Sequence, residues 1–206
     1  QNQHVDLQSL IQIPDLANFK ILINLREGEG VLADCRILTP ILFFKNLNSL
    51  SLKFLQSSLA TNELVQTLSQ IFSNKSQLKK LKLCLFPGFS QKLHTFQHIN
   101  SVHFENIFRA ISQMRKLEKL HLTITAFDFE NSSHIFQLFC NSLQNLTHLS
   151  TFYLRLHVIN IQSQEISILA QSIQKLTKIQ SLHLEISNDS LFEPVDFHFL
   201  TQSIVN

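Results

Sequence analysis

The chain has 206 residues, 44% of them hydrophobic, so it is long enough to bury a substantial core. Its 17 Lys and Arg residues against 15 Asp and Glu residues give a net charge of only +2, which argues against a protein that binds nucleic acid through bulk charge. With only 3 glycines, it contains neither GxxxxGKS/T nor GxGxxG, the phosphate-binding loops of nucleotide-binding proteins.

The longest nearly apolar run, 37–44, is interrupted by a threonine and a proline and is far shorter than the ~20 residues of a membrane-spanning helix. The three cysteines, Cys35, Cys84 and Cys140, are widely spaced and form no CxxC pair. A sparse, odd set of cysteines is typical of reduced thiols in an intracellular protein. We therefore expect a cytoplasmic protein with no membrane span.

In chain order, six segments share one apolar spacing, LxxLxLxφ, in which φ is apolar. Apolar residues alternate within each segment, which indicates a strand with one buried face. The segments are 16–23, 47–54, 78–85, 117–124, 149–156 and 179–186. Their first residues are separated by 31, 31, 39, 32 and 30 positions, so one structural unit is repeated along the chain. We expect the inward leucines, among them Leu120, Leu122, Leu182 and Leu184, to be buried in a parallel sheet.

The stretch before each strand has a helical period instead. Counted back from the first apolar residue of a segment, apolar residues tend to lie at −13, −10, −9, −6 and −3, which forms one stripe along a helix. Before Ile179 these positions hold Ile166, Leu169, Ala170, Ile173 and Leu176. Neither the strand nor the helix can bury its apolar face alone, whereas stacked units bury both. The sequence thus predicts a parallel sheet with a layer of helices.

This pattern resembles the leucine-rich repeats of the ribonuclease-inhibitor-like subclass, and most of all the divergent repeats of ciliates, over nearly the whole chain. The resemblance rests on LxxLxLxφ followed by a helix, and on the extra apolar position at the end of each motif, as at Phe54 and Leu85. It implies an α/β leucine-rich-repeat solenoid of about six repeats, with a curved parallel sheet on the concave side and helices on the convex side. Residues 1–206 then form a single leucine-rich-repeat domain.

Both ends of the chain stop within the repeat pattern. Leu7 and Leu10 fit the helix positions before the first strand, and Phe197, Leu200 and Ile204 fit the beginning of a further unit. No polar capping motif is visible at either end, although terminal repeats normally need one. We therefore expect a fragment of a longer repeat array, with self-association through the uncapped ends.

The residues between the buried strand positions should lie on the concave face. They include six Lys and Arg residues and a single acid, Glu185, so a continuous basic strip is predicted there. We expect an acidic protein partner on this face or on the strand-end loops, bound more tightly as histidines become charged near pH 6. Nucleic acid would need more aromatic platforms or many more basic residues. The candidate partner-binding residues are Lys53, Lys80, Lys82, Lys119, His121, Tyr153, Arg155, His157 and His183.

The longest interval contains an insertion within 86–100. Insertions in solenoids often lie on a binding edge, and the candidate contact residues here are Phe89, Lys92 and Phe96. The plainer interpretations are that this loop is only elongated and that the strand lysines form only a solvated surface.

No nucleophile–base pair and no set of three metal ligands stands out, so we predict no catalytic activity, no cofactor and no metal site. The preferred function is a protein–protein interaction scaffold. Two alternatives stay open. One is a regulatory repeat segment of a larger enzyme such as a protein kinase, whose HRD, DFG and VAIK motifs are absent from this sequence. The other is a binder of an anionic ligand through the basic strip.

Overall fold

The computed structural model describes residues 17–24, 35–55, 62–86, 101–128, 133–159, 161 and 163–188. Within these ranges, six parallel strands form one sheet, and their order in the sheet is their order in the sequence. The strands are β1 (Asn18–Asn24), β2 (Ser49–Leu55), β3 (Lys80–Phe86), β4 (Lys119–Asp128), β5 (Thr151–Ile159) and β6 (Ser181–Asn188). This arrangement confirms the predicted repetition of parallel strands.

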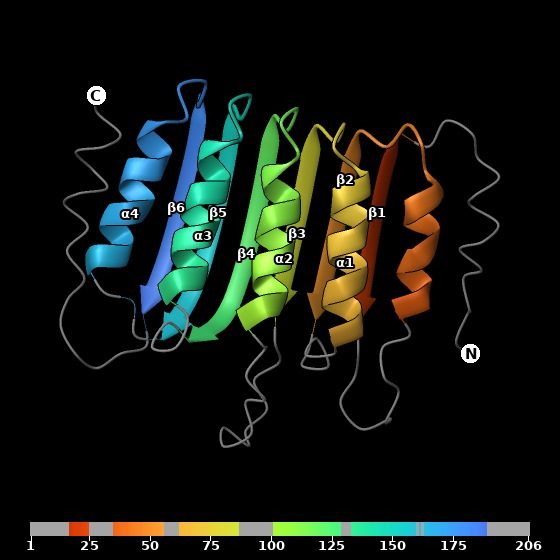
Figure 1. The fold of residues 1–206 in the computed structure, drawn as a ribbon, viewed down its shortest axis with the longest axis horizontal. Helices are drawn as coiled ribbons and strands as arrows, with labels where there is room; N and C mark the ends of the chain where they lie inside the picture. The colour runs from red at the N-terminus through yellow and green to blue at the C-terminus, as the bar shows by residue number, and fades with distance from the viewer. Residues whose placement is uncertain are drawn as a thin grey trace, which may run out of the picture.

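A helix precedes each strand from β2 onwards. The helices are η2 (Cys35–Phe43), α1 (Asn62–Asn74), α2 (Ser101–Ser112), α3 (Ser133–Gln144) and α4 (Ser163–Gln174). All of them lie on the same face of the sheet, where they form a second layer (Figure 1). Each described unit is therefore a helix followed by a strand, and the predicted α/β class is confirmed.

The strand register pairs equivalent residues of successive units. Leu50 pairs with Leu81, and Leu81 pairs with Leu120, although the interval between the last two contains the insertion. None of these three leucines is more than 2% exposed. The alternation in the sequence thus places the same position of each unit at the same height in the core.

The turns that lead into the strands also repeat, through backbone hydrogen bonds. The carbonyl of Asn48 accepts from the N–H groups of Lys79 and Lys80, both at 2.9 Å. The carbonyl of Lys79 accepts in the same way from Glu118 and Lys119, at 2.8 and 3.0 Å. The full set of these acceptors is Ala17, Asn48, Lys79, Glu118 and Ser150. Each turn is thereby bonded to the turn of the preceding unit.

The core lies between the sheet and the helices. The predicted apolar stripe of α4 and the turn that follows it is buried at all five positions, Ile166, Leu169, Ala170, Ile173 and Leu176. Aromatic rings fill the space between helices: the Phe108 ring of α2 lies 5.0 Å from that of Phe139 in α3, centroid to centroid. Neighbouring helices therefore share one continuous core with the sheet.

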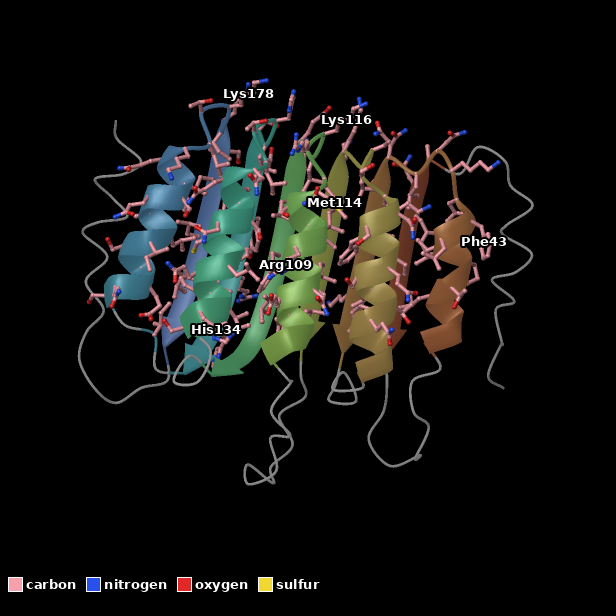
Figure 2. The ribbon with its side chains drawn as sticks, in the orientation of Figure 1. Phe43, Arg109, Met114, Lys116, His134 and Lys178 are labelled. Atoms are coloured by element: carbon pink, nitrogen blue, oxygen red, sulfur yellow. The ribbon has the colours of Figure 1, made fainter. Side chains whose placement is uncertain are left out.

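The first described helix, η2, is a 3₁₀ helix rather than an α-helix. It contains Pro40, which has no N–H to donate and whose ring clashes with an α-helical backbone. Its end is held by Lys75, a buried lysine whose Nζ donates to the carbonyls of Leu42 and Phe44 at 2.9 and 2.7 Å. Burial lowers the pKa of Lys75 from its usual 10.5. On the outer side of η2, Phe43 is 60% exposed (Figure 2).

The last described strand, β6, is less well covered than the central strands. Leu182 and Leu184 are only partly buried, whereas Leu122 and Leu154 are fully buried. Leu182 and Leu184 thus lie in the parallel sheet as expected, but the expectation that they are buried is met only in part. The physical reason is that, among the described strands, β6 pairs only with β5. The expected further units at either end, with Leu7, Leu10, Phe197, Leu200 and Ile204, lie outside the described residues.

Candidate binding face

The side of the sheet opposite the helices carries polar side chains, and we call it the open face. Because Leu81 and Leu83 point into the core, Lys80 and Lys82 must point away from it. The register aligns the open-face residues in rows that cross the strands. From β2 to β6, the first row is Ser49, Lys80, Lys119, Thr151 and Ser181; the second is Ser51, Lys82, His121, Tyr153 and His183; the third is Lys53, Cys84, Thr123, Arg155 and Glu185. In the register, β1 continues these rows with Asn18, Lys20 and Leu22.

Three lysines gather on β3 and β4, and we call them the lysine cluster: Lys80, Lys82 and Lys119. All three are exposed, and Lys80 and Lys119 are direct partners in the register. None of the ion pairs between described residues involves them. By contrast, Lys79 of the preceding turn reaches Glu118 at 3.5 Å. The cluster is thus a local excess of positive charge on the open face.

Beside this cluster, the second row forms a stack of three rings, which we call the ring stack. The Tyr153 ring lies 4.0 Å from that of His121 and 4.4 Å from that of His183, between centroids. The planes of these pairs differ by only 8° and 3°. Parallel strands are about 4.8 Å apart, so equivalent side chains on neighbouring strands stand at a spacing that suits stacking. Both faces of the Tyr153 ring are consequently occupied within the protein.

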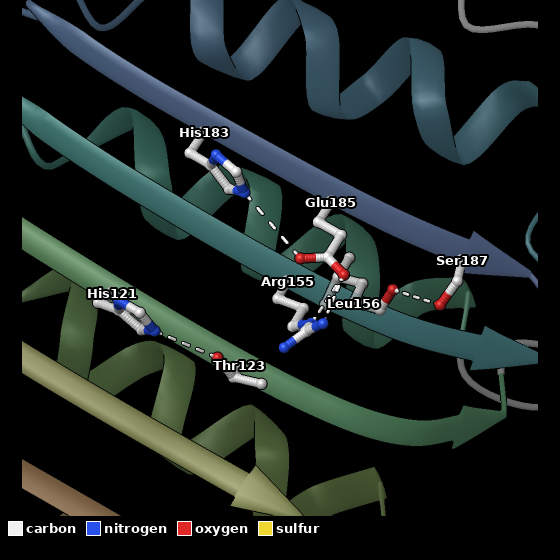
Figure 3. A network of polar contacts seen from close by, with 7 residues as sticks. All are labelled: His121, Thr123, Arg155, Leu156, His183, Glu185 and Ser187. Carbon is white, nitrogen blue, oxygen red and sulfur yellow. Dashed lines mark hydrogen bonds and ion pairs between the residues drawn. The ribbon is translucent and has the colours of Figure 1, made fainter.

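His121 is held in a position that disfavours a positive charge. Its Nε2 lies 3.3 Å from Thr123 Oγ1, a hydroxyl group that can satisfy a neutral imidazole (Figure 3). Burial, followed by the charges of Lys82 and His183, lowers the pKa of His121 to about 4. The expectation that the histidines of this face become charged near pH 6 is therefore wrong for His121.

Arg155 is paired rather than free. Its guanidinium donates to Glu185 Oε1 from both Nη2 and Nε, at 2.7 and 2.9 Å (Figure 3). His183 Nε2 lies 4.0 Å from the other carboxylate oxygen of Glu185. In the same row, the buried Cys84 and Thr123 separate Arg155 from Lys53. The predicted basic strip is therefore not continuous, because its charge is compensated at β5–β6 and interrupted in the third row.

The structure brings together most of the sequence-predicted site residues, but not all of them. The lysine cluster and the ring stack are adjacent, and His157 lies further along β5, half-buried and paired in the register with Ser187. Phe89, Lys92 and Phe96 lie outside the described residues. The sequence analysis missed the pairing of Arg155 with Glu185. The signal was present, because both residues occupy the same offset in consecutive repeats.

Cys84 and Cys140 do not build a reactive site within the described part of the chain. Cys84 pairs in the register with Thr123 and is buried, and Cys140 is buried in the helix layer. Burial raises the pKa of the Cys140 thiol well above its usual value. Among the described residues, no group of three or more His, Cys, Asp or Glu side chains could hold a metal ion. In the same ranges, no helix has the length and apolar character needed to cross a lipid bilayer.

No protein-family model matches the chain, and no curated protein matches it in sequence. Among solved structures, the chain is similar to a leucine-rich-repeat protein of Leptospira interrogans, with 16% sequence identity and a TM-score of 0.23. The similarity covers 97% of this chain and 62% of the other chain, so this chain spans less than two thirds of that protein's length.

Proposed function

We propose that the chain is a leucine-rich-repeat solenoid of the ribonuclease-inhibitor-like subclass that acts as a protein–protein interaction scaffold. The observation that carries the proposal is the open face itself. Six strands present polar side chains on the side of the sheet that the helices do not cover. A broad sheet face of this kind can accept a folded surface or an extended segment of another protein.

The internal regularity of the fold supports assignment to the repeat class. Equivalent residues are paired across every strand, and the same backbone hydrogen bonds join every described turn to the next. Stacked units that contact only their neighbours are the defining feature of solenoids. The α-helix that accompanies the strand in the units with α1 to α4 suits a leucine-rich repeat, in which a strand is paired with a helix.

The dimensions of the open face are adequate for a partner. Six strands about 4.8 Å apart, each of about seven residues at roughly 3.3 Å per residue, cover on the order of 600 Å². A standard interface buries about 800 Å² on each partner. We propose that the strand-end loops, including the insertion with Phe89, Lys92 and Phe96, supply the remainder. A cytoplasmic location and the lack of catalytic activity remain predictions, as does the alternative of a regulatory segment in a larger enzyme.

Site-specific photo-cross-linking tests the proposal. A benzoylphenylalanine at Thr151 or Ser181 lies on the open face, whereas one at Gln137 or Gln171 lies on exposed positions of the helices. In extracts of the source cell, we expect the two open-face positions to cross-link one and the same protein and the helix positions to leave it unlabelled. Equal labelling from both faces, or from the helices alone, would contradict the proposal.

A further inference from the structure

We propose that the open face binds an extended acidic segment of a protein partner across β3 to β6, with carboxylates at the lysine cluster and polar groups along the edges of the ring stack. This inference rests on the proposed function, since it specifies the partner chemistry for the same face. The proposed ligand is a peptide, and the experiment below compares its binding with that of a nucleic acid.

The first argument is charge complementarity. Lys80 and Lys119 stand directly opposite each other on neighbouring strands, an arrangement of like charges that destabilises a sheet. The protein compensates nearby cations, with Glu118 at Lys79 and Glu185 at Arg155. The lysine cluster has no such acid among the described residues. A partner's carboxylates would relieve this repulsion and would be attracted to the cluster during the encounter.

The second argument comes from the ring stack. Proteins that bind single-stranded nucleic acid without sequence preference stack bases on exposed aromatic faces. Tyr153 cannot serve in this way, because His121 and His183 already cover its two faces. What Tyr153 offers to a ligand is therefore its ring edge, and the phenol hydroxyl and the imidazole nitrogens on either side of it are hydrogen-bonding groups. Such edges suit the backbone and polar side chains of a peptide better than a nucleobase.

The third argument is the length of the row. Lys82 and His183 stand in the same row and are separated by three strand spacings, or about 14 Å. An extended peptide advances roughly 3.3 Å per residue, so about four or five residues span this distance. The fitting segment therefore has two or three acidic residues at the β3–β4 end, followed by several uncharged polar residues towards β6.

The experiment uses the whole chain and a fluorescein-labelled peptide of three glutamates followed by Ser-Asn-Ser-Asn, measured by fluorescence anisotropy. A matched peptide carries glutamines in place of the glutamates, and a labelled oligothymidylate represents nucleic acid. We expect the glutamate peptide to bind, with affinity falling as salt is raised, and the glutamine peptide to bind about tenfold more weakly. Equal affinity for both peptides, no binding, or tighter binding of the oligothymidylate would overturn the proposal.

Two triple variants locate the site. K80Q/K82Q/K119Q removes the lysine cluster, and R115Q/K116Q/K178Q removes the same number of positive charges from exposed turn positions outside the open face. Figure 2 labels Lys116 and Lys178 of the second set. We expect about a tenfold loss of affinity for the glutamate peptide in the first variant and less than about a twofold change in the second. An equal loss in both would show that net charge alone attracts the peptide, and the proposed site would be wrong.

The outcome can be separated from that of the proposed function. If Thr151 and Ser181 cross-link a partner whose binding is unchanged by K80Q/K82Q/K119Q, the acidic-segment proposal fails and the scaffold proposal stands. If open-face positions cross-link no partner while the glutamate peptide binds as expected, the peptide site stands and the scaffold proposal fails. Circular dichroism of every variant controls for the fold.

Discussion

The different burial of equivalent leucines leads to a quantitative prediction. Leu122 in β4 and Leu184 in β6 occupy the same inward position, each paired in the register with Leu154. Leu122 is 0% exposed, and Leu122→Ala removes three buried carbon atoms, whose burial stabilises the fold by roughly 2 kcal/mol. The cavity that remains raises the total loss of stability towards about 5 kcal/mol. Leu184 is only partly buried, and we expect Leu184→Ala to cost about 1–2 kcal/mol.

Urea unfolding measures both free energies. Circular dichroism follows the whole fold, and Tyr153, the single tyrosine in a chain without tryptophan, reports on β5, between the two substituted strands. Coincident transitions by the two probes would justify a two-state treatment, which repeat proteins do not always obey. If the two substitutions cost the same, or if Leu122→Ala costs less than about 1 kcal/mol, the argument from burial is refuted.

Three further predictions concern individual side chains. Because folding lowers the pKa of His121 from 6.5 to about 4, the unfolded chain binds more protons between these values, and His121 destabilises the fold as the pH falls through that range. When the pH is lowered from about 7 to about 4.5, the His121→Gln variant should therefore lose less free energy of unfolding than the native chain, as measured by urea titrations. An equal loss in both proteins would contradict the lowered pKa of His121. A double-mutant cycle of Arg155→Gln and Glu185→Gln should give a coupling of about 0.3–1 kcal/mol, because both side chains are nearly half exposed; zero coupling would show that the pair is only geometric. Cys140 should react with iodoacetamide only after unfolding, because burial raises the pKa of its thiol; mass spectrometry that finds rapid alkylation of the native protein would disprove this.

The sheet and its register could be predicted from the sequence because they depend on periods that every unit repeats. Apolar residues at every second position define the buried face of a strand, and apolar residues three and four positions apart define the buried stripe of a helix. The insertion tests this reasoning, since it lengthens one interval to 39 residues and yet Leu83 still pairs with Leu122. The register is held by the buried leucines, so extra residues between units do not alter it.

The charge state of the open face could not be predicted in the same way, because it depends on which side chains meet. Arg155 and Lys80 look alike in a count of basic residues, but Glu185 stands beside the first and Lys119 beside the second. The neutral state of His121 arises from burial and from neighbouring charges, which a composition does not record. The segment that forms η2 has the apolar spacing of a helix, but it contains Pro40 and is a 3₁₀ helix.

The hydrogen bonds that join the turns are formed mainly by backbone groups, and at one turn the Ser150 hydroxyl also donates to the carbonyl of Glu118, at 3.0 Å. The acceptor in each turn is a backbone carbonyl, and it belongs in succession to Ala17, Asn48, Lys79, Glu118 and Ser150. An apolar, an amide, a basic, an acidic and a hydroxyl residue thus perform one and the same task. Substitution at this position can change the charge along the edge of the molecule, as at Lys79 and Glu118, and leave the strands where they are. The charge of this edge is therefore set independently of the backbone bonds that hold the units together.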